Sequence, residues 1–128
     1  AWIEPTVSQS GWRTVLQHES DAYFLNASNS NGPLLPSGGG TLGGTTQFLS
    51  GTVASPVNAW TYLTTTYDGA TIRLYVNGTE VASRAASGAI QTTNSPLWIG
   101  GNSPYGEYFQ GLIDEVRVYN RALTAAES

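Results

Sequence analysis

The sequence predicts an all-β domain, an antiparallel β-sandwich or barrel. Short runs of β-branched and aromatic residues alternate with polar ones along most of the chain. Turn-forming residues interrupt these runs at intervals of about 8–12 residues, the spacing of a sandwich or barrel. Asn-Gly and Asp-Gly pairs stand between alternating runs, where a tight hairpin needs residues that accept positive φ.

The strands follow from this pattern in chain order. Asn77-Gly78 separates two alternating runs, and Asp68-Gly69 marks the turn before them, so residues 60–85 are predicted as a three-stranded meander. A short helical turn is expected only at 121–127. The strands are expected at 1–7, 13–19, 22–27, 46–53, 60–67, 71–77, 79–85, 97–100 and 112–119.

One segment lacks any periodicity. Residues 28–45 hold six Gly and two Pro among 18 residues. Such a stretch predicts a long surface loop, either functional or mobile.

Composition excludes several classes of protein. The chain has 128 residues, enough for one domain over 1–128, and has no Cys for disulfides or thiolate metal sites. Five basic residues against nine acidic ones give a net charge of −4, which cannot neutralise a phosphate backbone, so nucleic acid is not an expected partner. No run approaches the roughly 18 apolar residues of a membrane span. A polar, weakly charged composition with 11% aromatic residues is typical of extracellular β modules.

Several segments carry a family resemblance. They read NAWTYLTTTYDG at 58–69, TIRLYVNG at 71–78, LWIGGN at 97–102 and GLIDEVRVYNRAL at 111–123. In this order and spacing they resemble the laminin-G-like domains of the concanavalin A-like lectin and glucanase group. The resemblance implies an antiparallel jelly-roll sandwich in a secreted or cell-surface protein.

The N-terminal half matches this family less well. Ala1-Trp2-Ile3 resembles the end of a family strand, and the strand that precedes it in the family has no counterpart here. The chain is therefore expected to be part of a larger protein. Strand 112–119 should then lie at an open sheet edge, and open edges recruit other strands. The chain should either self-associate through this edge or cover it with its own segment 1–7, and self-association is favoured.

Enzymes share this architecture, and a hydrolase would need catalytic acids in a particular arrangement. Glucanases place acids two apart on one strand, where both carboxylates share a face. Only Glu19 and Asp21 have this spacing, at a polar strand end that predicts a solvated turn. His18 is the single His, and neither G-x-S-x-G nor H-E-x-x-H is present. No catalytic activity is expected.

Asp114 is the candidate metal ligand. In strand 112–119 it shares the more apolar face with Leu112, Val116 and Val118, which would place its carboxylate beside the core. A buried charge must be paired, hydrogen-bonded or metal-bound. The resemblance implies Ca²⁺ in some relatives, and Asp114 with carbonyls and waters would make a weak Ca²⁺ site. Backbone N–H groups or an Arg are the alternative partners.

The aromatic residues divide by location. Trp2, Trp60 and Trp98 lie on predicted strands and are expected in the core. Trp12, Tyr105 and Tyr108 lie in turn-rich segments, with Asn102 and Glu107 nearby. Aromatic faces and hydrogen-bonding groups together suit a sugar, so these five residues form the candidate ligand site. Packing of the rings over the end of the sandwich is the alternative.

These observations favour a non-catalytic binding module with a glycan as its partner, an inference that rests mainly on the family resemblance. A structural spacer or a protein-adhesion domain is the second hypothesis. A glycoside hydrolase of the same fold is the third.

Overall fold

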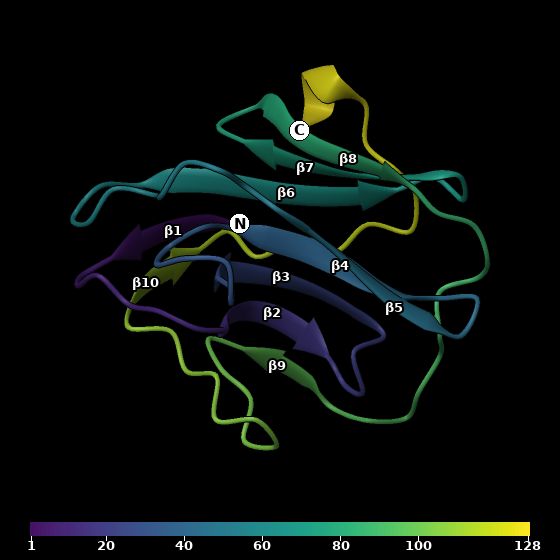
Figure 1. Ribbon diagram of the computed structural model, residues 1–128, viewed down its shortest axis with the longest axis horizontal. Coiled ribbons are helices and arrows are strands. Elements are labelled where there is room, and N and C mark those ends of the chain that lie inside the picture. Colours follow the sequence, from purple (N-terminus) through teal and green to yellow (C-terminus); the bar gives the residue numbers. More distant parts are fainter.

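Two antiparallel five-stranded sheets face each other in the computed structural model, which describes residues 1–128 (Figure 1). The first sheet has the strand order β10-β1-β6-β7-β8 and the second β5-β4-β3-β2-β9. The predicted all-β sandwich is confirmed. The strands are β1 Trp2–Pro5, β2 Arg13–His18, β3 Tyr23–Ser28, β4 Ser37–Leu42, β5 Thr45–Ser50, β6 Thr61–Tyr67, β7 Thr71–Val76, β8 Thr79–Ala85, β9 Leu97–Ile99 and β10 Gly111–Asp114.

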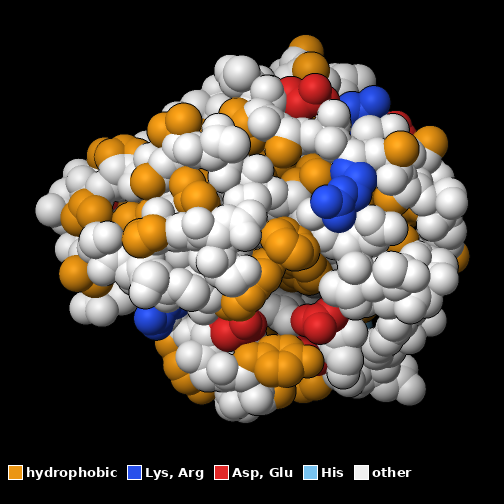
Figure 2. Space-filling view, viewed as in Figure 1, with side chains coloured by type: hydrophobic (Ala, Val, Ile, Leu, Met, Phe, Trp, Pro, Cys, Tyr) orange, Lys and Arg blue, Asp and Glu red, His pale blue; other side chains and the backbone are white.

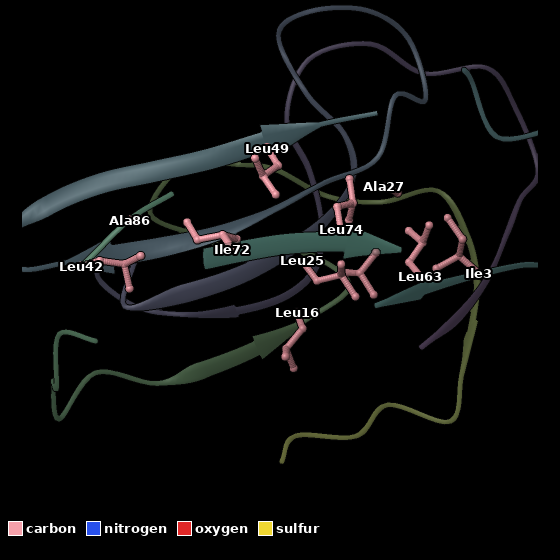
Figure 3. Close-up of a cluster of buried hydrophobic side chains, with 11 residues drawn as sticks. Ile3, Leu16, Leu25, Ala27, Leu42, Leu49, Leu63, Ile72, Leu74 and Ala86 are labelled. Carbon is pink, nitrogen blue, oxygen red and sulfur yellow. The ribbon is translucent and has the colours of Figure 1, made fainter. Parts of the chain in front are cut away.

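The core lies between the sheets, because alternate side chains of each strand point inward. Ile3, Leu63 and Leu74 come from the first sheet and are fully buried (Figure 3). Leu16, Leu25, Leu42 and Leu49 meet them from the second sheet. The predicted β6–β7–β8 meander is confirmed, and its Asn77 and Gly78 both have positive φ, 52° and 82°.

Strand β4 corrects the loop expected at 28–45. It lies between β3 and β5 in the second sheet, and half of its residues, Gly38 to Gly40, are glycine. A Cβ on Gly38 would lie 2.5 Å from the side chain of Thr65, which belongs to the opposite sheet. Glycine is therefore needed for this close approach. The remainder of the segment is held by buried Asn29, which donates to Leu35 O at 3.0 Å and Ser50 Oγ at 2.9 Å.

The C-terminal segment also differs from the prediction. Strand β10 ends at Asp114, because Glu115 has a φ of 50° that no strand residue adopts. The expected two-turn helix is a single 3₁₀ turn, Ala125–Glu127. Strand β10 pairs only with β1, so it is an edge strand as expected, although a shorter one.

The three tryptophans expected in the core face outward. Trp2 and Trp60 are exposed, and the Trp2 ring lies 5.1 Å from that of Tyr62 on the sheet surface. Trp98 is half-buried on the outer face of the second sheet, opposite Gln17. Ile113, not Asp114, packs against the core, so the prediction that Asp114 lies beside the core is wrong. No helix in the structure is both long and apolar enough to cross a membrane.

Candidate functional site

The candidate site lies on the outer face of the second sheet, at its β2 and β9 side. Leu16 of β2 points into the core, so Gln17 points outward, and Trp98 of β9 is its cross-strand partner. Residues 100–109 connect β9 to β10 and are hydrogen-bonded to β2. We call this segment the 100–109 loop.

Asn102 organises the 100–109 loop from a fully buried position. Its side-chain Nδ2 donates to Glu107 Oε1 at 2.7 Å and to Thr14 Oγ1 at 2.9 Å. Its Oδ1 accepts the Tyr105 N–H at 2.9 Å, and its backbone carbonyl accepts the Gly106 N–H at 2.8 Å. Because its side chain is enclosed, Asn102 cannot touch a ligand. It holds the loop in a turn against β2.

Further backbone contacts fix the same loop. Thr14 N–H donates to Glu107 O at 2.9 Å, and Arg13 Nη1 donates to Tyr108 O at 3.0 Å. Phe109 N–H donates to Gly100 O at 3.0 Å and closes the base of the loop. Loops tied in this way hold their side chains in place before any ligand arrives.

Two aromatic rings project from this loop. Tyr105 and Tyr108 are each 54% exposed. A Cβ on Gly101 would lie 2.3 Å from the Tyr108 ring, so that ring lies directly over the glycine. The loop therefore presents two half-exposed, supported aromatic side chains on the surface.

Glu19 lies beside this loop and corrects the expected solvated turn. Its side chain is only 4% exposed, and its Oε1 has no hydrogen-bond partner. Burial raises the pKa of Glu19, and the carboxylates of Asp21 and Glu107 raise it further, against the opposing effect of His18. The spacing of Glu19 and Asp21 was visible in the sequence, but their burial was not.

Asp21 and Tyr105 complete the electrostatics of the site. Asp21 Oδ1 accepts from Gln17 Nε2 at 2.6 Å, yet burial still raises the pKa of Asp21. The pKa of the Tyr105 hydroxyl is raised chiefly by Asp21, then by burial and by the carboxylates of Glu19 and Glu107.

The four ion pairs of the protein lie elsewhere, at Arg73–Asp68, Arg73–Glu80, Arg117–Glu115 and Arg121–Glu127. Figure 2 shows two acidic side chains with a hydrophobic one just below them, in the lower region where Figure 1 places β9 and the loop after it.

Trp12 lies in a separate aromatic cluster. Its ring meets Phe48 edge-on at 5.1 Å and Phe24 at 6.4 Å. Phe24 and Phe48 lie on either side of Gly39 in the register of β3, β4 and β5. The structure thus brings Asn102, Tyr105, Glu107 and Tyr108 together in one loop and places Trp12 farther along the same sheet face.

Asp114 lies at the exposed end of β10. Its Oδ1 accepts the Glu115 N–H at 2.8 Å. No group of three or more His, Cys, Asp or Glu residues is arranged to hold a metal ion. A Ca²⁺ ion at Asp114 would therefore depend on carbonyl and water ligands, and it stays a prediction.

A cavity of about 290 Å³ lies on the opposite side of the second sheet, between the sheets. Core side chains such as Leu16, Leu25 and Leu63 line it, together with residues of the 117–123 segment. It is therefore separate from the surface around Tyr105.

The fold and this surface define an antiparallel β-sandwich of the lectin-like type with a candidate site on one sheet. The chain belongs to the laminin G branch of the Concanavalin A-like lectin/glucanases superfamily, whose family model matches residues 1–127. The predicted family is confirmed. No curated protein sequence matches the chain.

Solved structures with the same fold include two proteins linked to carbohydrate. A Bacteroides ovatus ATCC 8483 protein, to which carbohydrate binding has been attributed, has a TM-score of 0.80 and 24% identity over 99% of this chain and 38% of that one. Domain 4 of AbnA, a GH43 extracellular arabinanase from Geobacillus stearothermophilus solved with arabinotriose, has a TM-score of 0.74 and 24% identity over 98% of this chain and 61% of that one.

A third structure is an S-layer domain-containing protein from Clostridium thermocellum ATCC 27405. Its TM-score is 0.51 at 23% identity, over 91% of this chain and 61% of that one. The chain spans between about four and six tenths of these three structures. At such identities the likeness concerns the fold.

Proposed function

We propose that this chain is a non-catalytic glycan-binding module of an extracellular protein, and that the 100–109 loop is its binding site. The observation that carries the proposal is the buried Asn102, which holds Tyr105 and Tyr108 half-exposed beside the partly buried Glu107 and Asp21. Aromatic faces accept the C–H face of a sugar ring, while carboxylates accept its hydroxyl hydrogens.

The solved relatives support this proposal at the level of fold. The arabinanase domain was solved with arabinotriose and belongs to an extracellular enzyme, and the S-layer protein also suggests an extracellular setting. This β-sandwich can therefore carry a sugar site. Which residues carry it in this chain is argued from the 100–109 loop alone.

Burial of Glu19 argues against hydrolysis. Glycosidases need two carboxyl groups flanking one glycosidic bond, about 5–5.5 Å apart in retaining enzymes. The Glu19 Oε1 atom is shielded from solvent, so a glycosidic oxygen cannot reach it. Asp21 lies past the end of β2 at a φ of 55°, and its carboxylate is held by Gln17. Turnover of glucan, xylan, arabinan or pectin that disappears in Glu19→Gln would overturn the non-catalytic proposal.

Calorimetric titration tests the binding site. A glycan screen, with and without Ca²⁺, should find a neutral oligosaccharide with a Kd on the order of mM to tens of μM. The Tyr105→Ala, Tyr108→Ala double variant should lose this binding. Tyr119→Ala, which removes an exposed ring outside the loop, is the matched control and should retain it. Equal binding by wild type and the double variant would place the site elsewhere, and a screen without any ligand would favour a structural spacer.

A further inference from the structure

The carboxylates beside the 100–109 loop have no cationic partner. Asp21 is hydrogen-bonded to Gln17 and Glu107 to Asn102, both neutral amides, while Glu19 Oε1 has no partner. Arg13 is the basic residue bonded to the loop, and its guanidinium donates to the carbonyls of Ser10 and Tyr108 and forms no ion pair. No ion pair within the protein therefore compensates the negative charge at this surface, and His18 is the one base that acts on it, opposing the raised pKa of Glu19.

The layer beneath the loop also contains buried polar atoms without hydrogen-bond partners. Asn26 Oδ1 is a second acceptor without a partner, in a side chain only 2% exposed. Asn26 is the cross-strand partner of Thr14, which bonds Asn102, so it lies in the same outward-facing layer as Glu19 and Gln17. The Trp98 indole N–H and the hydroxyl of Ser37, the cross-strand partner of Asn26, also lack partners in this layer. Buried acceptors without donors are uncommon, and each calls for an explanation.

The exposed part of this surface combines negative charge with aromatic faces. Asp21 and Glu107 are partly accessible, and Tyr105 is 54% exposed within reach of their field. A cation over an aromatic face is attracted by the ring, and unscreened carboxylates within about 10 Å add to that attraction at moderate salt. An anion at the same place meets repulsion from all three carboxylates.

We infer that the surface around Tyr105 selects glycans by charge: it binds neutral sugars, binds sugars with a primary ammonium group more tightly, and rejects uronic acids and sulfated sugars. This inference rests on the proposed glycan site. A resident metal ion is not the preferred cation, because the carboxylates do not form a group arranged to hold one. An ammonium group on a 2-amino sugar brings charge and N–H donors together.

Four oligosaccharides of equal length separate the possibilities by calorimetry at pH 6: a β-1,4-glucosamine hexamer, its N-acetylated form, a cellohexaose and a hexagalacturonate. At about 20 mM salt, we expect the glucosamine hexamer to bind at least fivefold more tightly than the two neutral hexamers. The hexagalacturonate should show no detectable binding. The advantage of the amino sugar should shrink at 200 mM salt, since surface charges are then screened more strongly.

Charge-neutral variants assign any preference to the site. Asp21→Asn and Glu107→Gln should each reduce the advantage of the amino sugar by twofold or more. Glu80→Gln, on β8 of the first sheet, is the control and should leave that advantage unchanged. Two variants are used because either could disturb the loop, and a urea midpoint confirms that each is folded.

The outcomes separate the inference from the function on which it rests. Neutral hexamers that bind as tightly as the amino sugar, or a uronate that binds tighter, would overturn charge selection and leave the glycan site standing. Failure of all four sugars to bind would count against the glycan site itself. An amino-sugar preference unaffected by Asp21→Asn and Glu107→Gln would also overturn the inference.

Discussion

Asp68 and Glu19 are carboxylates in opposite environments. Asp68, in the turn between β6 and β7, accepts the N–H groups of Ala70 and Thr71 at 2.9 and 2.8 Å and pairs with Arg73 at 2.9 Å. These hydrogen bonds lower the pKa of Asp68 to about 2. Glu19, on the second sheet, is buried beside two other carboxylates, and its pKa is raised.

The contrast separates carboxylates that serve the fold from those that do not. Asp68 stabilises a hairpin, and its ionised form is the favoured one. Glu19 ionises at a cost to stability, because desolvation and like charges disfavour its anion. Perturbed carboxylates of this kind cluster at functional sites. The comparison therefore identifies the β2 and β9 side of the second sheet, and not the Asp68 turn, as the candidate binding region.

The largest effect is expected for Asn102→Asp. This change places a fourth carboxylate in a fully buried position, where the Asn102 side chain now lies 2.7 Å from Glu107 Oε1. An uncompensated buried charge costs about 3–5 kcal/mol. Urea unfolding should show this loss, whereas Asn31→Asp at an exposed position should change the free energy of unfolding very little. Equal stability of the two variants would contradict the description of the loop.

Opposite signs are expected for Glu19→Gln and Asp68→Asn at pH 7. Glu19→Gln removes a buried, unpaired charge and should raise Tm by about 3 °C, equivalent to roughly 1 kcal/mol. Asp68→Asn removes an ion pair and a turn-capping carboxylate, so it should lower Tm. Calorimetry on the two variants checks this directly, and a fall in Tm for both would remove the contrast.

Stability should depend on pH differently in the two regions. The pKa values of Glu19 and Asp21 are raised, so the folded state binds their protons more tightly than the unfolded chain does. The contribution of these two groups to the free energy of unfolding therefore falls as pH rises through the raised pKa values. The pKa values of Asp68 and Glu127 are lowered to about 2, so their contribution is present above about pH 4 and is lost as pH falls toward 2.

Urea midpoints from pH 3 to 8 measure both contributions. Glu19→Gln should flatten the curve above about pH 4.5, and Asp68→Asn should flatten it below pH 4. The Ala1 amine, whose pKa burial lowers to about 6, acts in the opposite sense between pH 6 and 8. The contribution of each carboxyl group is therefore taken from the difference between the pH curves of wild type and variant, in which the effect of the Ala1 amine cancels. A Glu19→Gln curve that parallels wild type would show that Glu19 carries no ionisation penalty.

The smallest effect concerns strand β10, whose outer edge is unpaired and whose Leu112 is 52% exposed. Self-association through this edge should appear as a rise in molar mass with concentration in light scattering. Leu112→Lys should suppress it, because charged residues protect sheet edges. Since β10 lies in the other sheet, glycan binding should be unchanged in this variant. A strict monomer at high concentration would rule out association through the edge.

The sequence predicted most strands because alternating side chains record which face is buried. It could not predict β4, because glycines carry no side chain to alternate and their role depends on Thr65 in the opposite sheet. It also placed Asp114 on the wrong face. Val116 and Val118 made that face look apolar, but the strand ends before them, because the backbone turns at Glu115 to a φ of 50°.

The candidate loop was predicted from its composition, but the roles within it were not. Asn102 was expected to contact a ligand and is instead fully buried. Glu19 was expected in a solvated turn, but its backbone bonds Thr93 and Pro96, and its carboxyl lies near Glu107 of the 100–109 loop, all more than 70 residues away in the chain. Contacts of that range leave no local signal. The nearest clue was the i, i+2 spacing of Gln17, Glu19 and Asp21 at the end of a predicted strand.

Amide and indole chemical shifts during a neutral-oligosaccharide titration test the central claim most directly. Shift changes should concentrate at residues 102–108 and at the indole N–H of Trp98, with none at the Asp68–Arg73 hairpin. Changes confined to the outer face of the first sheet, or none at the 100–109 loop while a sugar binds, would contradict the account.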